Sequence, residues 1–360
     1  MRKSIVLLVT LVLTVGLSLP AAFAESAEKS LTLEQAIALA LQKNTGVKKA
    51  ESEIDRTEAL RKQAADKVLF TPIMGGSGYD AETESNWNKL LSADLNWQMS
   101  KKTFESTKDS LVLNVYKSYW DVQTAQMKLD LQKKLNQQAL IKLQDTRTGI
   151  RAGTVSPSDL VAVEAAWQQA QSNLVTTQNA LDTAYTDFNQ LLGLNPNERP
   201  QLTGTPVYEP LNVTDLDYEV EKAIGSSPRV WEAQQNVTKA EWSADMIYSS
   251  GDYTPYEVRQ ISVYQAELSA VDARDSLEKT VRNLYYQIKN LEEDYSIAQK
   301  TLQTAQENLR VAKLKFDAGM STNAEVVAAE IEVARDQESI EEMVRNHAYL
   351  KMSFEKPWTA

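Results

Sequence analysis

The stretch from Leu277 to Phe316 constrains the fold more than any other part of the sequence, because its apolar residues recur at alternating steps of four and three. They are Leu277, Val281, Leu284, Ile288, Leu291, Tyr295, Ala298, Leu302, Ala305, Leu309, Ala312 and Phe316. This period of about 3.5 residues lies below the 3.6 of a straight α-helix, so the stripe stays on one face only if the helix supercoils around a neighbour. We therefore predict one long coiled-coil helix here.

The next segment supplies the neighbour. The helix is predicted to end at Asp317-Ala318-Gly319, where glycine favours the left-handed conformation of a helix C-terminus. A second helical pattern starts at once, near Ser321 or Thr322. Its seam consists of Val326, Ala329, Val333, Asp336, Ile340, Met343, His347 and Leu350. The two segments predict an antiparallel hairpin with a tight tip.

The first half of the chain has the same design. A helical pattern runs from about Phe104 to Ile150, turns at Arg151-Ala152-Gly153 and restarts after Ser156-Pro157. An earlier amphipathic helix begins at Leu33, breaks at Asn44-Thr45-Gly46 and resumes to about Lys67. These patterns predict a second long hairpin preceded by a shorter, interrupted helix.

A β-like segment is expected between those helices. Leu91, Ala93, Leu95, Trp97 and Met99 alternate with polar residues, and a period of two predicts a half-buried strand. The glycine-rich stretch Val68–Tyr79 before it is ambiguous between strand and loop.

The two halves are related by duplication. The opening helices match at a constant offset of 183 residues, as in Leu33 with Leu216, and the hairpins match at an offset of 166, as in Gly153 with Gly319. The fall from 183 to 166 means that the second half lacks 17 residues where the first has the β-like segment. We predict one helical domain over residues 25–360, with repeat one at 31–192, a proline-rich linker at 193–217 and repeat two at 218–352. Two such hairpins leave apolar seams unpaired, so a closed homo-oligomer is expected.

The N-terminus has the pattern of an export signal. Arg2 and Lys3 precede an apolar run from Ile5 to Leu19, and Ala22-Phe23-Ala24 has the small residues of a cleavage site. Residues 1–24 are predicted to be a signal peptide; a membrane anchor is the weaker interpretation, because the run is short for a membrane span. Its removal takes the net charge from -11 to -13, which argues against nucleic acid as a partner.

Enzyme chemistry finds little support in the residues. The sequence has no cysteine and one histidine, and no glycine-rich phosphate loop. We expect His347 to be a packed seam residue, Asp336 to be a register-setting or tunnel-facing group, and the acidic run at Glu292 to lie on a solvated helix face. No catalytic residue, cofactor or metal site is predicted.

The order of these features resembles the TolC-type outer-membrane efflux proteins. The resemblance rests on Leu31-Thr32-Leu33-Glu34-Gln35-Ala36-Ile37 at the start of repeat one and on the paired tips Arg151–Ser156 and Asp317–Thr322. It implies a mainly α fold of long antiparallel coiled-coil hairpins in two sequence repeats, a TolC-like α-barrel protomer with a reduced β segment. Family protomers contribute four membrane strands each, of which repeat one here offers two at most.

The resemblance also implies a function and its sites. It implies an exported homotrimer of the cell envelope, in the outer membrane, that forms the tunnel of an efflux or type I secretion system. Solutes would enter it from an inner-membrane transporter through a periplasmic adaptor that docks on the tips. The adaptor contacts carried over are Gly153, Thr154, Ser156, Asp159, Gly319, Met320, Ser321 and Glu325. The tunnel-mouth gate carried over is Asp159, Phe316 and Glu325. The alternative is an exported coiled-coil scaffold or envelope spacer of the same fold that transports nothing.

Overall fold

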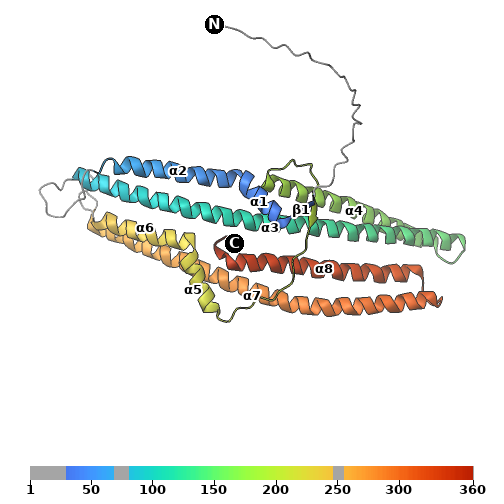
Figure 1. Ribbon diagram of the computed structural model, residues 1–360. Coiled ribbons are helices and arrows are strands. Elements are labelled where there is room, and N and C mark those ends of the chain that lie inside the picture. The colour runs from blue at the N-terminus through green and yellow to red at the C-terminus, as the bar shows by residue number, and fades with distance from the viewer. Residues whose placement is uncertain (1–29, 69–80, 246–254, 360) are drawn as a thin grey trace, which may run out of the picture.

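The computed structural model describes residues 30–68, 81–245 and 255–359 (Figure 1). The predicted signal peptide, residues 1–24, lies outside the described residues. So do residues 69–80, which make up most of the ambiguous stretch, and residues 246–254, which precede the long helix of the second repeat.

The helices follow one order twice. Repeat one contains α1 (Leu33–Lys43), α2 (Thr45–Ala65), α3 (Ala81–Arg151) and α4 (Pro157–Leu192). Repeat two contains α5 (Leu216–Ser226), α6 (Pro228–Asp245), α7 (Tyr256–Asp317) and α8 (Asn323–Glu355), and a short 3-10 turn, η1 (Pro357–Thr359), follows. The predicted mainly α fold of long antiparallel hairpins in two repeats is confirmed.

Both repeats break their opening helix with a polar cap. The Asn44 side chain ends α1 and begins α2 by accepting hydrogen bonds from the N–H groups of Gly46 (2.8 Å) and Val47 (3.3 Å). Ser227, 183 residues later, ends α5 and accepts from the N–H of Val230 at 3.3 Å. Such caps satisfy donors at a helix start that have no partner within the helix.

The predicted strand at Leu91–Met99 is wrong, because these residues lie within α3. The apolar residues that alternate along it also include Leu91, Leu95 and Met99, which are spaced by four and share one side of a helix. Packing against α2 decides between the two readings: Leu95 is buried, and the hydroxyls of Ser100 and Thr57 meet at 2.9 Å between the helices. Tertiary contact therefore overrides the period of two.

The strands of the described residues are short and lie elsewhere. β1 (Ser30–Thr32) pairs in parallel with β2 (Gln201–Thr203), which lies in the predicted linker. The buried Tyr119 of α3 donates its hydroxyl to the carbonyl oxygens of Leu31 (2.9 Å) and Thr203 (2.6 Å). This side chain joins the start of repeat one and the linker to the longest helix of the repeat.

The long helices lie side by side in a fixed order (Figure 1). Toward the end that bears the C-terminus of α2, α3 packs between α2 and α6, and α6 packs against α7; toward the other end, α3 packs between α4 and α8, and α8 packs against α7. The helix α3 has 71 residues and a length of roughly 107 Å, so it runs along the whole molecule. In this order α7 is one edge, partly covered by α5, while α2 and α4 form the opposite edge.

The second half of the linker crosses the second hairpin. We call residues 204–215 the strap. The Tyr208 ring stacks on Tyr295 of α7 with 3.9 Å between ring centroids, and it lies 4.9 Å from the ring of His347 on α8. The N–H of Leu211 donates to Glu292, and Lys289 donates to the Leu211 carbonyl oxygen at 2.7 Å.

The structure of this region tests two predictions about single residues, His347 and Glu292. His347 is 2% exposed and packed in the seam, as predicted, and its Nε2 lies 3.1 Å from Oε1 of Glu292. The expectation of a solvated Glu292 is wrong, since its carboxylate is 12% exposed and binds the strap. The spacing placed Glu292 outside the apolar stripe, but it carries no information about a strap that covers the helix from elsewhere in the chain.

Candidate functional site

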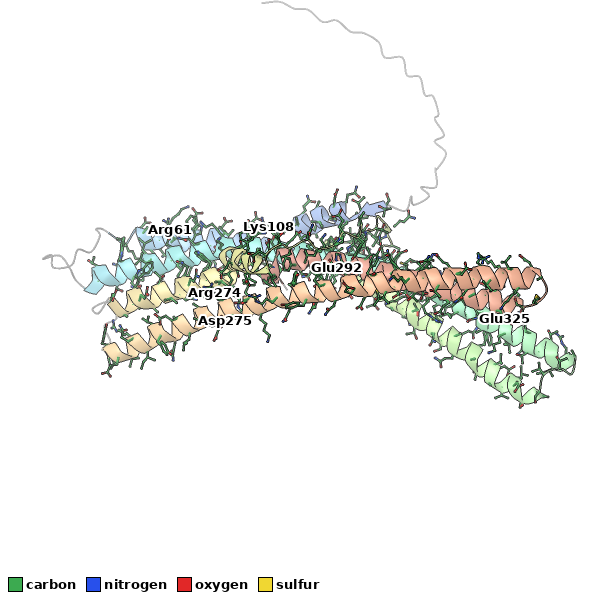
Figure 2. All side chains as sticks on the ribbon, turned by 90° about the horizontal axis from the view of Figure 1, so that it is seen from below. Arg61, Lys108, Arg274, Asp275, Glu292 and Glu325 are labelled. Atoms are coloured by element: carbon green, nitrogen blue, oxygen red, sulfur yellow. The ribbon has the colours of Figure 1, made fainter. Side chains whose placement is uncertain are left out.

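The two hairpin tips lie at the same end of the molecule (Figures 1 and 2), and Glu325 marks the second of them in Figure 2. At the first tip, α3 ends at Arg151 and Gly153 has a φ of 75°. The N–H of Thr154 returns to the carbonyl oxygen of Gly149 at 2.9 Å. At the second tip, Gly319 has a φ of 69° and the N–H of Met320 returns to Lys315 at 2.8 Å. Both tips are thus the same glycine-terminated turn, as their sequences predict.

The first tip is more tightly constrained than the second. A Cβ added to Gly149 would lie 2.5 Å from Cγ2 of Val155, so a side chain here would displace Val155. The position 166 residues later is Lys315, and there the residue equivalent to Val155 is Ser321, whose hydroxyl donates to the Ala312 carbonyl oxygen at 3.4 Å. Sequence analysis missed the role of Gly149.

The polar tip residues begin the returning helices. Ser156 caps α4 by accepting from the N–H of Ser158 at 3.3 Å, and Thr322 caps α8 by accepting from the N–H of Glu325 at 3.4 Å. Asp159 and Glu325 lie in the first turns of these helices, where a carboxylate is favoured by the helix dipole. Their side chains are exposed, so these acids remain available for a partner.

The predicted gate residues are exposed at the tips. Phe316 is 43% exposed at the end of α7, and among the described residues no hydrogen bond or ion pair joins Asp159 to Glu325. Met320, the most exposed large apolar residue of the tips, is 76% exposed. In one chain, therefore, the tips present exposed apolar and acidic groups and no closed latch.

A second feature, which we call the open edge, is a row of apolar side chains along α7 that are 45% to 64% exposed. It consists of Tyr256, Val258, Ile261, Tyr264, Leu268, Val271, Tyr286, Ile297 and Leu314. Within it, Ile261, Tyr264, Leu268 and Val271 follow steps of three and four, the spacing of a coiled-coil seam. The buried residues of the same segment, such as Ala273 and Leu277, face the core.

The opposite edge also carries exposed apolar residues. On α4, Val161 is 71% exposed and Val175 is 61% exposed, and they lie two heptads apart on one face. The edges are different surfaces, so contact between copies would join unlike faces in a head-to-tail manner.

Membrane-spanning helices and metal-binding clusters are both absent from the described residues. None of the helices in residues 30–68, 81–245 and 255–359 is both long and apolar enough to cross a membrane. In the same residues, no group of three or more histidine, cysteine or acidic side chains is placed to hold a metal ion.

Comparison with known proteins finds a family match over part of the chain and a shared fold over most of it. The family described as outer membrane efflux protein matches residues 83–194, which include most of α3, the first tip and all of α4. Among curated proteins, none matches this sequence.

Solved structures of similar shape extend over nearly the whole chain. A membrane protein from Pseudomonas aeruginosa is 11% identical with a TM-score of 0.70, covering 91% of this chain and 93% of that one. The outer membrane protein VceC from Vibrio cholerae is 11% identical with a TM-score of 0.67, covering 91% and 95%. The outer membrane channel MtrE of Neisseria gonorrhoeae, in its open state, is 14% identical with a TM-score of 0.65, covering 91% and 89%. The predicted resemblance to TolC-type proteins is confirmed, and the family and fold matched are those of channel proteins.

Proposed function

From a chain whose family match and fold are those of outer-membrane efflux proteins, we propose that three copies form the tunnel of an efflux or type I secretion system. The tunnel receives solutes from an inner-membrane transporter through a periplasmic adaptor. The protein acts in the cell envelope after export, and it acts as a conduit without catalysing a reaction. The observation that carries this proposal is the open edge of α7.

The open edge supports assembly because monomeric soluble proteins rarely expose so long a row of apolar side chains to water. The coiled-coil spacing of the open edge favours a helix as its partner. Because the two edges of the molecule differ, contact between copies joins unlike faces, which favours a closed ring. In that ring α7 of one copy packs against α2 and α4 of the next. The number three comes from the family resemblance.

The tips support docking of an adaptor. They lie at the C-terminal ends of α3 and α7, which are roughly 107 Å and 93 Å of continuous helix, and both project the same turn. A ring of three copies would present six such turns in one circle. Gly153, Thr154, Ser156 and Asp159 would contact the adaptor at one set of turns, and the other set would offer Gly319, Met320, Ser321 and Glu325.

We further propose that the gate forms only on assembly. Asp159 begins the returning helix of the first hairpin, whereas Phe316 and Glu325 flank the tip of the second, so we assign the narrow tunnel mouth to tips that meet from neighbouring copies. A phenyl ring donates no hydrogen bond, so the closure at Phe316 is apolar packing.

The test is crosslinking of the tips in cells. The chain has no cysteine, so a single cysteine at Ser156 or Ser321 provides a unique attachment point for a photocrosslinker. A crosslink to a periplasmic adaptor, together with loss of efflux-dependent resistance on deletion, supports the conduit. Absence of any adaptor crosslink, with resistance unchanged on deletion, supports the alternative of a coiled-coil spacer.

A further inference from the structure

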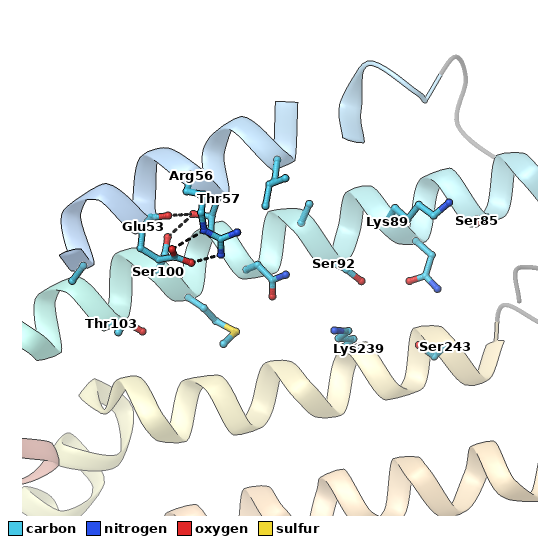
Figure 3. Close-up of a pocket in the computed structure, with 16 residues that line it drawn as sticks. Glu53, Arg56, Thr57, Ser85, Lys89, Ser92, Ser100, Thr103, Lys239 and Ser243 are labelled. Atoms are coloured by element: carbon cyan, nitrogen blue, oxygen red, sulfur yellow. Dashed lines mark hydrogen bonds and ion pairs between the residues drawn. The ribbon is translucent and has the colours of Figure 1, made fainter. Parts of the chain in front are cut away.

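A groove separates the two repeats near the C-terminal end of α2. It has a volume of about 780 Å³ and lies between α2 and α3 of repeat one and α6 of repeat two (Figure 3). Its lining on α3 extends from Ser85 to Thr103, roughly 27 Å of helix. The groove is therefore long and narrow.

The groove exists because the face of α3 that lines it is mostly polar. Ser85, Asn88, Ser92, Asn96, Met99 and Thr103 follow coiled-coil steps of three and four along that face, and Met99 is its one apolar member. At such positions leucine or isoleucine would pack the helices together, whereas small polar side chains leave a gap. The polar residues that suggested the outer side of a strand, Ser92 and Asn96, belong to this face.

The charge of the groove is opposite to that of the chain. Arg56 is paired with Glu53 through a hydrogen bond of 2.7 Å, which leaves Lys89 and Lys239 as the unbalanced charges of the lining. Neither lysine makes a hydrogen bond or ion pair with any residue in the described part of the chain. Figure 3 shows Lys239 on α6 and Lys89 on α3, on opposite sides of the groove. The whole chain has a net charge of -11, so this is a local basic site in an acidic protein.

The lining also offers the two other features that a sugar chain needs. Hydroxyl and amide groups on α3 both donate and accept hydrogen bonds, as sugar hydroxyls require. Leu60, Ala93 and Met99 supply apolar surface on the α2–α3 side for the C–H face of a sugar ring. The combination of an extended shape, neutral polar groups and two free cations fits an acidic oligosaccharide.

We propose that this groove binds an acidic saccharide chain, with Lys89 and Lys239 holding its carboxylate or phosphate groups. The site is distinct from the tips and from the open edge, and it does not depend on the proposed transport. An acidic peptide is the competing ligand, but the uncharged hydroxyl-rich face favours the saccharide.

The experiment is calorimetric titration of the mature protein with trigalacturonate, and with maltotriose, inorganic phosphate and an Asp-Glu tripeptide as comparisons. Trigalacturonate is expected to bind, and the variant K89A/K239A to bind it about tenfold more weakly. The matched control K48A/K49A removes the same charge from exposed positions of α2 outside the groove, and is expected to bind as the unaltered protein does.

A second variant tests the groove itself. S92L/N96L restores apolar residues to the seam, and is expected to raise the melting temperature by packing α3 on α6 and to abolish binding. The proposal is overturned if trigalacturonate does not bind, or if K89A/K239A and the control K48A/K49A weaken its binding equally. It is also overturned if the tripeptide or phosphate binds as tightly as trigalacturonate. Unchanged binding by S92L/N96L would also overturn it, because the ligand would then lie elsewhere.

Discussion

The imidazole Nε2 of His347 on α8 lies 3.1 Å from the carboxylate Oε1 of Glu292 on α7, beneath the strap. The same carboxylate accepts from the N–H of Leu211 and from Lys289 (2.8 Å), so one side chain joins α7, α8 and the strap. Figure 2 places Glu292 near the middle of the molecule. We infer that this contact fixes the strap on the second hairpin.

Replacing Glu292 with glutamine is therefore expected to destabilise the protein by about 1 to 3 kcal/mol, because charge-assisted hydrogen bonds are weakened and a donor is left unpaired. Chemical denaturation at pH 7 measures the change. The exposed neighbour Glu293 provides the control, and Glu293→Gln is expected to lie within about 0.5 kcal/mol of the unaltered protein.

The same variant predicts a pH dependence. Burial acts to raise the pKa of Glu292, but hydrogen bonds from Lys289, the Leu211 N–H and His347 outweigh it, so the pKa lies below its ordinary value. A lowered pKa contributes stability that is present above the unfolded value of about 4.3 and is lost as the pH falls through the folded value. The stability difference between the unaltered protein and Glu292→Gln should thus be present at pH 7 and shrink as the pH falls below about 4.3 through the folded pKa. A difference that stays the same, or grows, as the pH falls below that value would contradict this.

Asp336 is predicted to have the opposite effect on how stability depends on pH. It occupies the α7–α8 seam, and its Oδ2 is buried without a hydrogen-bond partner. Burial, reinforced by the charge of Glu332, raises the pKa of Asp336. Stability from this group is therefore present below the unfolded pKa of about 3.9 and lost as the pH rises through the folded value.

At pH 7, Asp336→Asn is expected to raise the melting temperature by about 2 °C, since it removes the charge and keeps the shape. The gain should vanish near pH 3, where Asp336 is already neutral. Thermal unfolding at both values tests this, with exposed Asp294→Asn as the control. A lower melting temperature at pH 7 would show that the carboxylate stabilises the seam.

The tip glycines are expected to matter for docking and little for folding. Gly153→Val with Gly319→Val imposes a β-branched residue on two positive φ angles, at a cost of about 1 to 2 kcal/mol each. No atom lies within 4 Å of an added Cβ at either position, so the strain is confined to the backbone of the turn. Circular dichroism should show unchanged helicity, while adaptor crosslinking is lost.

The matched control is Gly153→Asn with Gly319→Asn, because asparagine adopts the left-handed region more readily. It is expected to retain crosslinking. Equal crosslinking in the valine and asparagine variants would mean that adaptor binding does not depend on the conformation of the turns.

Local signals explain what the sequence could predict. Repeating seams located the long helices, and Asn44, Ser156, Gly153 and Gly319 marked their ends, since capping and positive φ depend on residues close in sequence. The same signals located the two tips, whereas the roles of the tip residues came from the family resemblance.

What the sequence could not predict depends on distant contacts. The face of α3 that includes Ser92 was misjudged because a period of two and a period of 3.6 overlap over nine residues, and α2 decides between them. The position of Glu292 beneath the strap and the groove beside Lys239 arise where segments far apart in the chain meet.

The central claim is that the open edge of α7 joins copies into a closed ring of three. Sedimentation equilibrium of the mature protein at micromolar concentration measures the mass directly. The account predicts the mass of three chains, and predicts that Ile261→Asp with Leu268→Asp gives a folded monomer by placing charges in the seam. Ser262→Asp with Ser269→Asp, which adds the same charges on another exposed face of α7, should remain trimeric. A monomeric unaltered protein, or a trimer that persists in the Ile261 and Leu268 variant, would contradict the claim.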